Sequence, residues 1–203
     1  MKLISVILTV LICCTALIGD FVVFKSKYSD SQVFRAISDS STHAAIGLLS
    51  ALLFFTYETG LSDQARLYNV MFCTALSSLI DIDHFIAAKS FKLKDLVHLK
   101  QRGILHCTTL WILLTAISLF LSHLTKRLNI YTLTFMAVLA YMSHHVRDAN
   151  RRGLWLYPFG HTPPLSKYFY IFLLLVLPRV VANLYLYMKP AYRHTVLYYD
   201  SLV

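Results

Sequence analysis

Histidine and aspartate residues stand in close pairs in a chain that is otherwise strongly apolar. Asp81 and His84 are three residues apart, and His144 and Asp148 are four apart. In a helix, such spacings place both members of a pair on one face. Helical bundles build metal sites from imidazole and carboxylate pairs of this kind. The two pairs therefore indicate a site that is shared between helices.

Two further histidines, His43 and His106, each stand near the start of an apolar stretch. With them, the candidate metal ligands are His43, Asp81, His106, His144 and Asp148. Nitrogen and oxygen ligands together suit zinc, and also manganese or iron, rather than a soft-metal thiolate site. We therefore expect a divalent metal ion, with zinc first among these. Such an ion generates hydroxide from a bound water near neutral pH, which is the chemistry of hydrolysis.

Four further residues, each close in the sequence to a candidate metal ligand, are candidates for catalysis rather than for metal binding. His84 or Asp83 would orient a ligand or act as a general base. Arg102 and Arg147 would receive the negative charge that develops on a phosphate. The same groups could instead form a buried hydrogen-bonded network without a metal, and their spacing alone does not separate the two interpretations. Asp39 is interpreted as a cap of the second apolar helix.

The composition places these groups in a membrane protein. The chain has 203 residues, of which 57% are hydrophobic and 14% charged, and its mean hydropathy is +0.60. Soluble domains carry about 25% charged residues, so too few are present here to cover a soluble surface. The net charge of +9 is typical of basic loops that face anionic headgroups. We expect the lipid bilayer as the partner, and no nucleic acid.

Six stretches are apolar and close to the roughly 20 residues that cross the hydrocarbon core. They are Leu3–Val23, Ser41–Tyr57, Leu67–Ala88, Ile104–Leu124, Ile130–Val146 and Tyr168–Met188. The second and fifth are the shortest. We predict an all-α, polytopic membrane helical bundle of about six transmembrane helices, which forms a single membrane-embedded domain over residues 1–203. The first stretch is expected to be a retained helix rather than a signal peptide.

Helices that alternate in direction would bring the polar groups to one end of the bundle. These groups lie at the ends of the first, third and fifth stretches and at the starts of the second and fourth. The loops at this end carry about twice as many Lys and Arg residues as those at the other end, which predicts a cytoplasmic location for the site. Both termini are then expected on the opposite side.

Several motifs, in the same order along the chain, resemble those of the animal transmembrane protein 267 family. They are Arg35–Asp39 followed by His43 and Gly47, Ile80–Phe85, Leu105–Cys107, Ser143–Asp148, and Arg152–Trp155 leading to Pro158–Gly160. This resemblance covers almost the whole chain. It implies a multi-pass membrane protein whose biochemical activity is not established.

A more distant resemblance links the chain to the LexA-binding, inner-membrane-associated proteins of bacteria that are regarded as metal-dependent hydrolases. It rests on His43 with Gly47, Asp81–His84, Arg102–Cys107, and Ser143–Asp148. The resemblance implies a metal-dependent hydrolase. Leu105 and Cys107 stand where the bacterial motif has Thr and Ser, so the small hydroxyls beside His106 are lost.

Three functions are open at this point. The first is a membrane-embedded, metal-dependent hydrolase that acts on a lipid or phospho-ester arriving from the bilayer. The alternative is a non-catalytic membrane scaffold that retains the site as a structural element. A proton or metal-ion carrier is the third, but it would need polar groups along the whole crossing, and the second, fourth and sixth stretches have few of them in their far halves.

Overall fold

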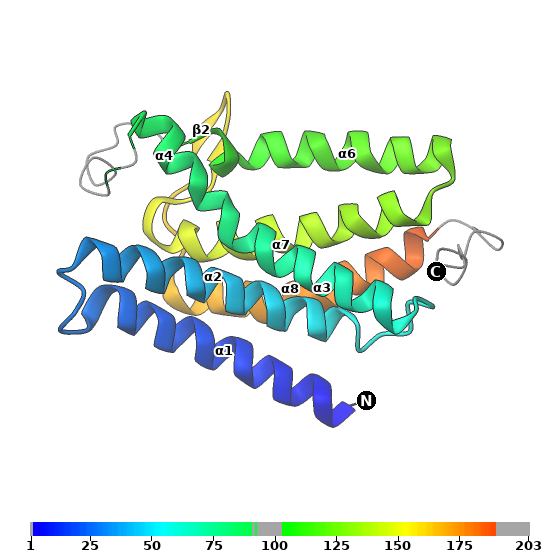
Figure 1. Cartoon of the computed structure of the whole chain (residues 1–203), viewed down its shortest axis with the longest axis horizontal. Helices are drawn as coiled ribbons and strands as arrows, with labels where there is room; N and C mark the ends of the chain where they lie inside the picture. The colour runs from blue at the N-terminus through cyan, green and yellow to red at the C-terminus, as the bar shows by residue number, and fades with distance from the viewer. Residues whose placement is uncertain (1, 91, 93–102, 190–203) are drawn as a thin grey trace.

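The chain folds as a bundle of antiparallel helices, seen in a computed structural model that describes residues 2–90, 92 and 103–189 (Figure 1). The helices are α1 (Lys2–Lys25), α2 (Gln32–Phe54), α3 (Asp63–Leu79), α4 (Asp83–Ala88), α6 (Thr108–Thr125), α7 (Leu128–Arg152) and α8 (Lys167–Met188). Two 3₁₀ turns, η1 (Ile80–Ile82) and η2 (Ile104–His106), lie next to α4 and α6. The predicted all-α class is confirmed, and the strands described are β1 (Trp155–Leu156) and β2 (Gly160–His161), an antiparallel hairpin after α7.

Among the described residues, four helices are long and apolar enough to cross a membrane. They are α1, α3 continued through η1 and α4, α6, and α8. Large apolar side chains such as Leu3, Ile18 and Phe120 project from the outside of α1 and α6. A soluble protein would bury many of these side chains, whereas lipid is a favourable surrounding for them.

The central helix is α7, which packs against α2, α3, α6 and α8. Neighbouring helices therefore shield it from lipid, so that it can carry polar residues that an outer helix could not. Its buried residues include Ser143, His144, His145 and Arg147. This position explains why the fifth apolar stretch is short in the sequence although the helix itself has 25 residues.

Two predicted helix boundaries differ from those in the structure because charged residues lie inside the helices. α2 begins at Gln32 rather than Ser41, and α7 continues past Val146 to Arg152. The interpretation of Asp39 as a cap is wrong. Ser31 caps α2, since its hydroxyl accepts a hydrogen bond from the backbone amide of Phe34. Asp39 lies within the helix, facing α7.

α2 and α3 approach each other closely along their length. A Cβ atom at Gly47 would lie 2.2 Å from the hydroxyl oxygen of Ser77 and 3.3 Å from the carbonyl oxygen of Cys73. Only glycine leaves room for this contact, as is common where membrane helices pack tightly. The contact fixes the position of Ser77, whose own carbonyl group forms part of the site described below.

The direction of the helices decides which residues meet. α1 begins and α8 ends at one end of the bundle, while the ends of α1, α4 and α7 meet the starts of α2, α6 and α8 at the other (Figure 1). We call the second of these the site end. All the His and Asp clusters that the sequence predicts to converge, so far as the structure describes them, lie there.

Candidate metal centre

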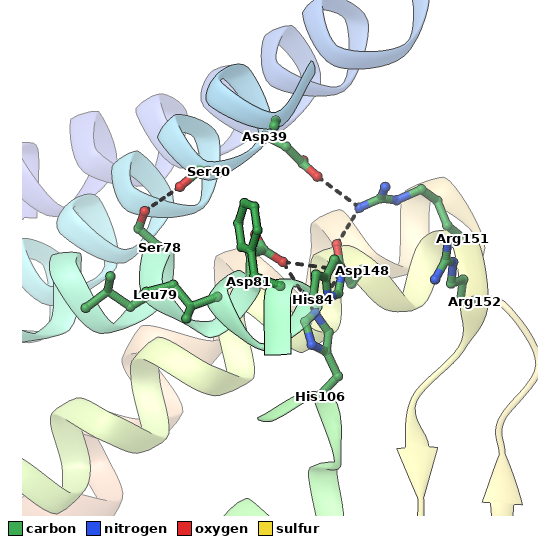
Figure 2. A pocket seen from close by; sticks show the side chains of 13 residues that line it. Asp39, Ser40, Ser78, Leu79, Asp81, His84, His106, Asp148, Arg151 and Arg152 are labelled. Carbon is green, nitrogen blue, oxygen red and sulfur yellow. Dashed lines mark hydrogen bonds and ion pairs between the residues drawn. The ribbon is translucent and has the colours of Figure 1, made fainter. Parts of the chain in front are cut away.

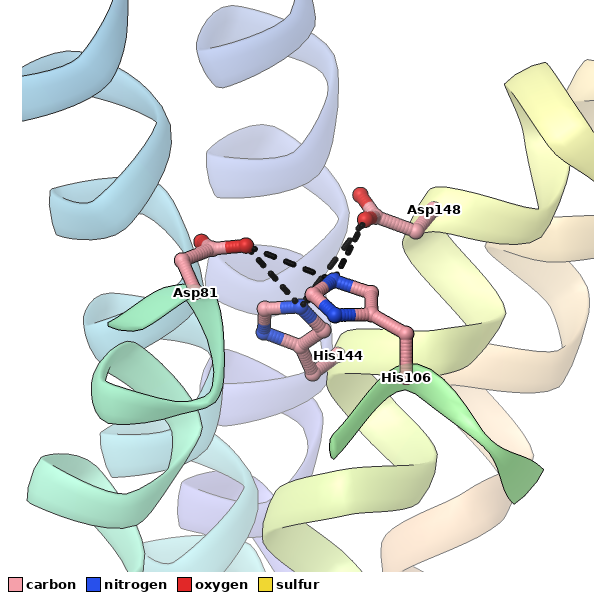
Figure 3. A group of neighbouring side chains, drawn as sticks. All are labelled: Asp81, His106, His144 and Asp148. Carbon is pink, nitrogen blue, oxygen red and sulfur yellow. Dashed lines mark hydrogen bonds and ion pairs between the residues drawn. The ribbon is translucent and has the colours of Figure 1, made fainter. Parts of the chain in front are cut away.

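Four side chains from three parts of the chain point at a common centre at the site end (Figure 3). They are Asp81 of η1, His106 of η2, and His144 and Asp148 of α7. The Nε2 atoms of His106 and His144 are 3.3 Å apart. Asp81 Oδ1 lies 3.4 Å from the first and 3.5 Å from the second. Asp148 Oδ2 lies 3.6 and 3.8 Å from the same two atoms.

These separations fit the ligand shell of a small divalent cation. Ligands bonded at 2.0–2.1 Å in a tetrahedron lie ~3.3 Å from one another. All four ligand atoms lie within 4.8 Å of one another. Four of the five predicted metal ligands are therefore close enough to share one ion.

The other ring nitrogen of each histidine fixes which nitrogen faces the centre. Nδ1 of His106 is 3.1 Å from both carboxylate oxygens of Asp83, and Nδ1 of His144 is 2.8 Å from the backbone carbonyl oxygen of Ser77. Carboxylate and carbonyl oxygens only accept hydrogen bonds, so both Nδ1 atoms carry a proton. In the neutral rings, both Nε2 atoms then present lone pairs to the centre, which is the arrangement that a metal requires.

The centre attracts positive charge strongly. Burial by itself lowers the pKa of His106, which precedes the membrane-spanning helix α6. The hydrogen bonds with Asp148, Asp81 and Asp83 outweigh this effect and raise that pKa to about 11. Two carboxylates and two imidazole lone pairs that face one another repel unless a proton or a cation lies between them. The donor set therefore fits a divalent metal ion.

His43, the fifth predicted ligand, lies beside the cluster rather than within it. Its ring stacks on that of His144, with the centroids 3.7 Å apart. Its Nε2 atom is 3.5 Å from Oδ1 of Asp148, while the other oxygen of that carboxylate faces the centre. His43 thus contacts two of the four residues, His144 and Asp148, without facing the common centre.

Arg147 is buried in an ion-pair network away from the pocket lining. Its Nε donates to Asp20 at 3.2 Å, and its Nη1 donates to Asp39 at 2.6 Å and lies 2.9 Å from Nε2 of His43. Asp20 also accepts a hydrogen bond from Tyr170. The guanidinium therefore ties α7 to α1 and α2, and through Asp20 to α8. Its predicted role toward a phosphate stays a prediction.

The structure places the candidate catalytic residues at different depths. Asp83 is buried, and besides His106 it accepts a hydrogen bond from Nδ1 of His84 at 2.9 Å. His84 is 29% exposed, and its Nε2 lies 3.9 Å from Oδ1 of Asp81. A Cβ atom at Gly103 would lie 2.1 Å from the carboxyl carbon of Asp83, so only glycine fits there. Arg102 lies outside the described residues.

His145, which follows a metal-ligand candidate directly, has a different role. Its Nε2 donates to the carbonyl oxygen of Leu105 at 3.1 Å, because a carbonyl oxygen only accepts, and its Nδ1 accepts from the hydroxyl of Thr108 at 3.1 Å. The indole of Trp111 donates to the same carbonyl at 2.6 Å. Together they anchor the turn η2, and with it the residue next to Leu105, which is His106.

A pocket of about 260 Å³ opens beside the cluster (Figure 2). Three of the four clustered residues line it, as does His84. Arg151 and Arg152, which the sequence analysis missed, line it as well. Nη2 of Arg151 is 2.5 Å from Asp148 and 3.6 Å from Asp39. The signal that could have found Arg151 is its spacing of three residues from Asp148 on one helix.

Comparison with known proteins gives the family. Residues 39–199 match the family described as YdjM inner membrane protein. The chain belongs to this YdjM and transmembrane protein 267 family. Transmembrane protein 267 of Mus musculus is 38% identical over 152 residues, which are 74% of this chain and 68% of the relative. Those of Xenopus laevis (37% over 147 residues) and Danio rerio (38% over 152) cover 72% and 74% of this chain.

The alignments span about two thirds of the length of these family members, between 66% and 68%. No solved structure matches the chain. The resemblance to transmembrane protein 267 and the membrane location predicted from the sequence are confirmed. All four clustered ligand candidates fall inside the stretch that matches the YdjM family.

Proposed function

We propose that the protein is a membrane-embedded, metal-dependent hydrolase that acts on a lipid or phospho-ester. The observation that carries the proposal is that three residues of the cluster, Asp81, His106 and Asp148, form part of the wall of an open pocket. Catalytic metal sites keep one side accessible to water and substrate, whereas structural sites are closed.

Different residues would bind the ion, orient its histidine ligands and transfer the proton. Asp81, His106, His144 and Asp148 would hold the ion, while Asp83 and the carbonyl of Ser77 keep the two imidazoles in the required tautomer. A divalent ion bound there would lower the pKa of a coordinated water and so make hydroxide available at neutral pH. His84 lines the pocket, and because its Nδ1 donates to Asp83, its Nε2, which lies 3.9 Å from Oδ1 of Asp81, is the ring nitrogen with an available lone pair. That Nε2 accepts the proton from water and returns it to the leaving oxygen.

Arg151 is the cation placed to meet an anionic substrate. Its guanidinium lines the pocket while it also contacts Asp148 and Asp39. Arginine binds phosphate oxygens through several donors in a fixed plane, so donors not used by these carboxylates can face the substrate.

A non-catalytic scaffold is the second candidate, and one observation favours it. Four protein ligands already complete the shell that is usual for a structural metal ion. In that case the ion would join α7 to η1 and η2 and stabilise the bundle, and the pocket would have no catalytic role.

The two candidates separate in one experiment on the purified protein in detergent. We expect about one metal ion per chain in the wild type and in His123→Ala, whose histidine is exposed, and loss of the ion in His144→Ala. His84→Ala should keep the metal and lose most of the hydrolysis of a soluble ester such as bis(p-nitrophenyl) phosphate. Metal without any ester hydrolysis in the wild type would favour the scaffold, and a wild type without metal would overturn both candidates.

A further inference from the structure

The pocket beside the cluster has two sides of different chemistry. The polar side includes three of the clustered residues, Asp81, His106 and Asp148, together with Arg151 and Arg152. The other side is apolar and includes Ala36 of α2, and Leu79 and Ile82 of the segment that runs from α3 into η1. A ligand that fills the pocket must therefore join a polar group to an apolar one.

The pocket opens between α2 and the α3–η1 segment. The hydroxyls of Ser40 and Ser78 are 2.5 Å apart and hold the two helices together (Figure 2). Ala36 lies one turn from Ser40 toward the site end, and Ile82 lies one turn beyond Ser78 on the other wall. Both residues line the pocket, so the opening lies on the site-end side of the serine contact.

The surface around this opening is apolar. Leu79 is 49% exposed and Ile82 is 45% exposed, although both also line the pocket. Outside the pocket, Ile37 on α2 and Ile86 on α4 are exposed, and each directly follows a residue that lines the pocket, Ala36 or Phe85. Leu79, Ile82 and Ile86 belong to a helix long and apolar enough to span the membrane. The opening therefore faces hydrocarbon or the adjoining interface, and an apolar chain can pass through it without entering water.

The groups that line the pocket favour a phosphate over a neutral head group. Five carboxylates lie in or beside the cluster with three guanidinium groups; they are Asp20, Asp39, Asp81, Asp83 and Asp148, with Arg147, Arg151 and Arg152. A divalent cation at the cluster would bring the summed charge of this set to zero. The guanidinium groups that line the pocket, those of Arg151 and Arg152, can then donate charge-assisted hydrogen bonds to the oxygens of an anionic phosphate, which a neutral ester does not offer.

We infer that the substrate of this site is a membrane phospholipid that enters sideways from the bilayer between α2 and α3. Its phosphate lies against Arg151 and the cluster, and its hydrocarbon chain leaves along Leu79 and Ile82. The inference rests on the proposed hydrolase function. In the reaction, water adds across a phosphorus–oxygen ester bond: the hydroxyl goes to phosphorus, the proton goes to the leaving oxygen, and no oxidant or reductant is consumed.

Substitutions that narrow the opening of the pocket but keep the four clustered residues test this inference. Ala36→Trp places a bulky ring in the opening, and Leu79→Trp does the same from the opposite wall, which guards against a folding defect in either variant. Ile37→Trp is the matched control, because Ile37 is exposed on the same helix but does not line the pocket. Each protein is assayed for metal content, for hydrolysis of soluble bis(p-nitrophenyl) phosphate, and for release of water-soluble phosphate compounds or glycerol from vesicles of dioleoylphosphatidate and dioleoylphosphatidylglycerol.

We expect the wild type to hydrolyse the vesicle lipids, and both tryptophan variants to lose at least roughly tenfold more activity toward the vesicles than toward the soluble diester. The control should match the wild type in both assays. Equal losses toward the two substrates would overturn sideways entry. Hydrolysis of the soluble diester without hydrolysis of the vesicles would overturn the lipid substrate and leave the hydrolase intact. Metal without either activity would instead mean that the proposed function itself has failed.

Discussion

The carboxylate of Asp83 lies directly behind the imidazole of His106. Both of its oxygens are 3.1 Å from Nδ1, and one of them also accepts a hydrogen bond from the backbone amide of His106 at 3.2 Å. His106 lies in the turn η2, outside the long helices, so its position depends on local contacts of this kind. The buried carboxylate therefore determines both where the ring lies and which nitrogen faces the cluster.

Replacing Asp83 should weaken metal binding although it is not one of the four clustered ligands. We expect Asp83→Ala to lower the affinity for zinc roughly 10–100-fold, the usual effect of losing the partner of a metal-bound histidine. Gly103→Ala should act in the same direction, because its methyl group displaces the Asp83 carboxylate. Competition with a fluorescent chelator measures the affinity, and Asp63→Ala, at a carboxylate that is 99% exposed, is the control. An unchanged affinity in both site variants would mean that His106 is not a ligand.

Metal binding should release a proton. The raised pKa of His106, about 11, means that the metal-free protein keeps this histidine protonated throughout the neutral range. A metal ion must displace the proton from Nε2, so the affinity should rise with pH, by roughly tenfold per unit for one proton. Calorimetry in buffers of different ionisation enthalpy counts the protons released. Affinity that is constant between about pH 6 and pH 8 would contradict the arrangement described for the cluster.

Removing the buried cation of Arg147 should destabilise the whole bundle. Asp20 and Asp39 would lose this partner, although Asp20 keeps its hydrogen bond from Tyr170 and Asp39 its 3.6 Å contact with Arg151. Breaking a fully buried ion pair costs roughly 3–5 kcal/mol, and these partly exposed carboxylates should cost less than that. We expect Arg147→Met to unfold at a clearly lower temperature in detergent. Adding Asp20→Asn and Asp39→Asn to it should recover part of the loss, because the unpaired charges are then gone. If the triple variant is no more stable than Arg147→Met, the network is not what supports the bundle.

His43 should affect the strength of metal binding rather than the number of ions bound. It stacks on His144 and contacts the oxygen of Asp148 that does not face the centre, so it lies beside the four clustered ligands rather than among them. We therefore expect His43→Ala to bind about one ion per chain with reduced affinity, while Asp148→Ala loses the ion. Elemental analysis after dialysis separates the two outcomes, and loss of stoichiometric metal in His43→Ala would restore His43 to the ligand set.

The orientation in the membrane can be tested with two single cysteines. Lys27 is exposed at the site end and Lys126 is exposed at the other end. The excess of basic residues in the site-end loops predicts that Lys27→Cys is protected in intact cells from a membrane-impermeant thiol reagent, and that Lys126→Cys reacts. The wild type supplies the background from its own cysteines. The reverse pattern would place the site on the opposite side of the membrane.

Much of the cluster was accessible to sequence reasoning because it depends on helix geometry. The spacing of His144 and Asp148 puts them on one face, and alternation of helix direction brings Asp81 and His106 to the same end. The same reasoning could not place His43. Its rotation about α2 depends on tight packing near Gly47, which neither hydropathy nor spacing encodes.

The separate roles of Arg147 and Arg151 could not be predicted from the sequence either. Arg147 and Arg151 are one helical turn apart on α7, yet the first is buried among carboxylates and the second faces the pocket. Which of the two is buried depends on where Asp20 and Asp39 lie on helices far away in the sequence. Charged residues inside helices likewise hid the true lengths of α2 and α7, because a hydropathy criterion stops at residues such as Asp39 and Asp148 that are paired only in the folded protein.

The placement of Arg147 between two of the clustered residues, His144 and Asp148, has a consequence for biogenesis. A nascent chain delivers Asp20, Asp39, Asp81 and His106 to the membrane before the ribosome has completed α7. The same two turns of α7 then supply half of the ligand set and the cation that matches the waiting carboxylates. Insertion of this one helix therefore brings the matching cation to the earlier segments and completes the cluster in a single step, so a metal ion that needs all four side chains would bind only after α7 is in place.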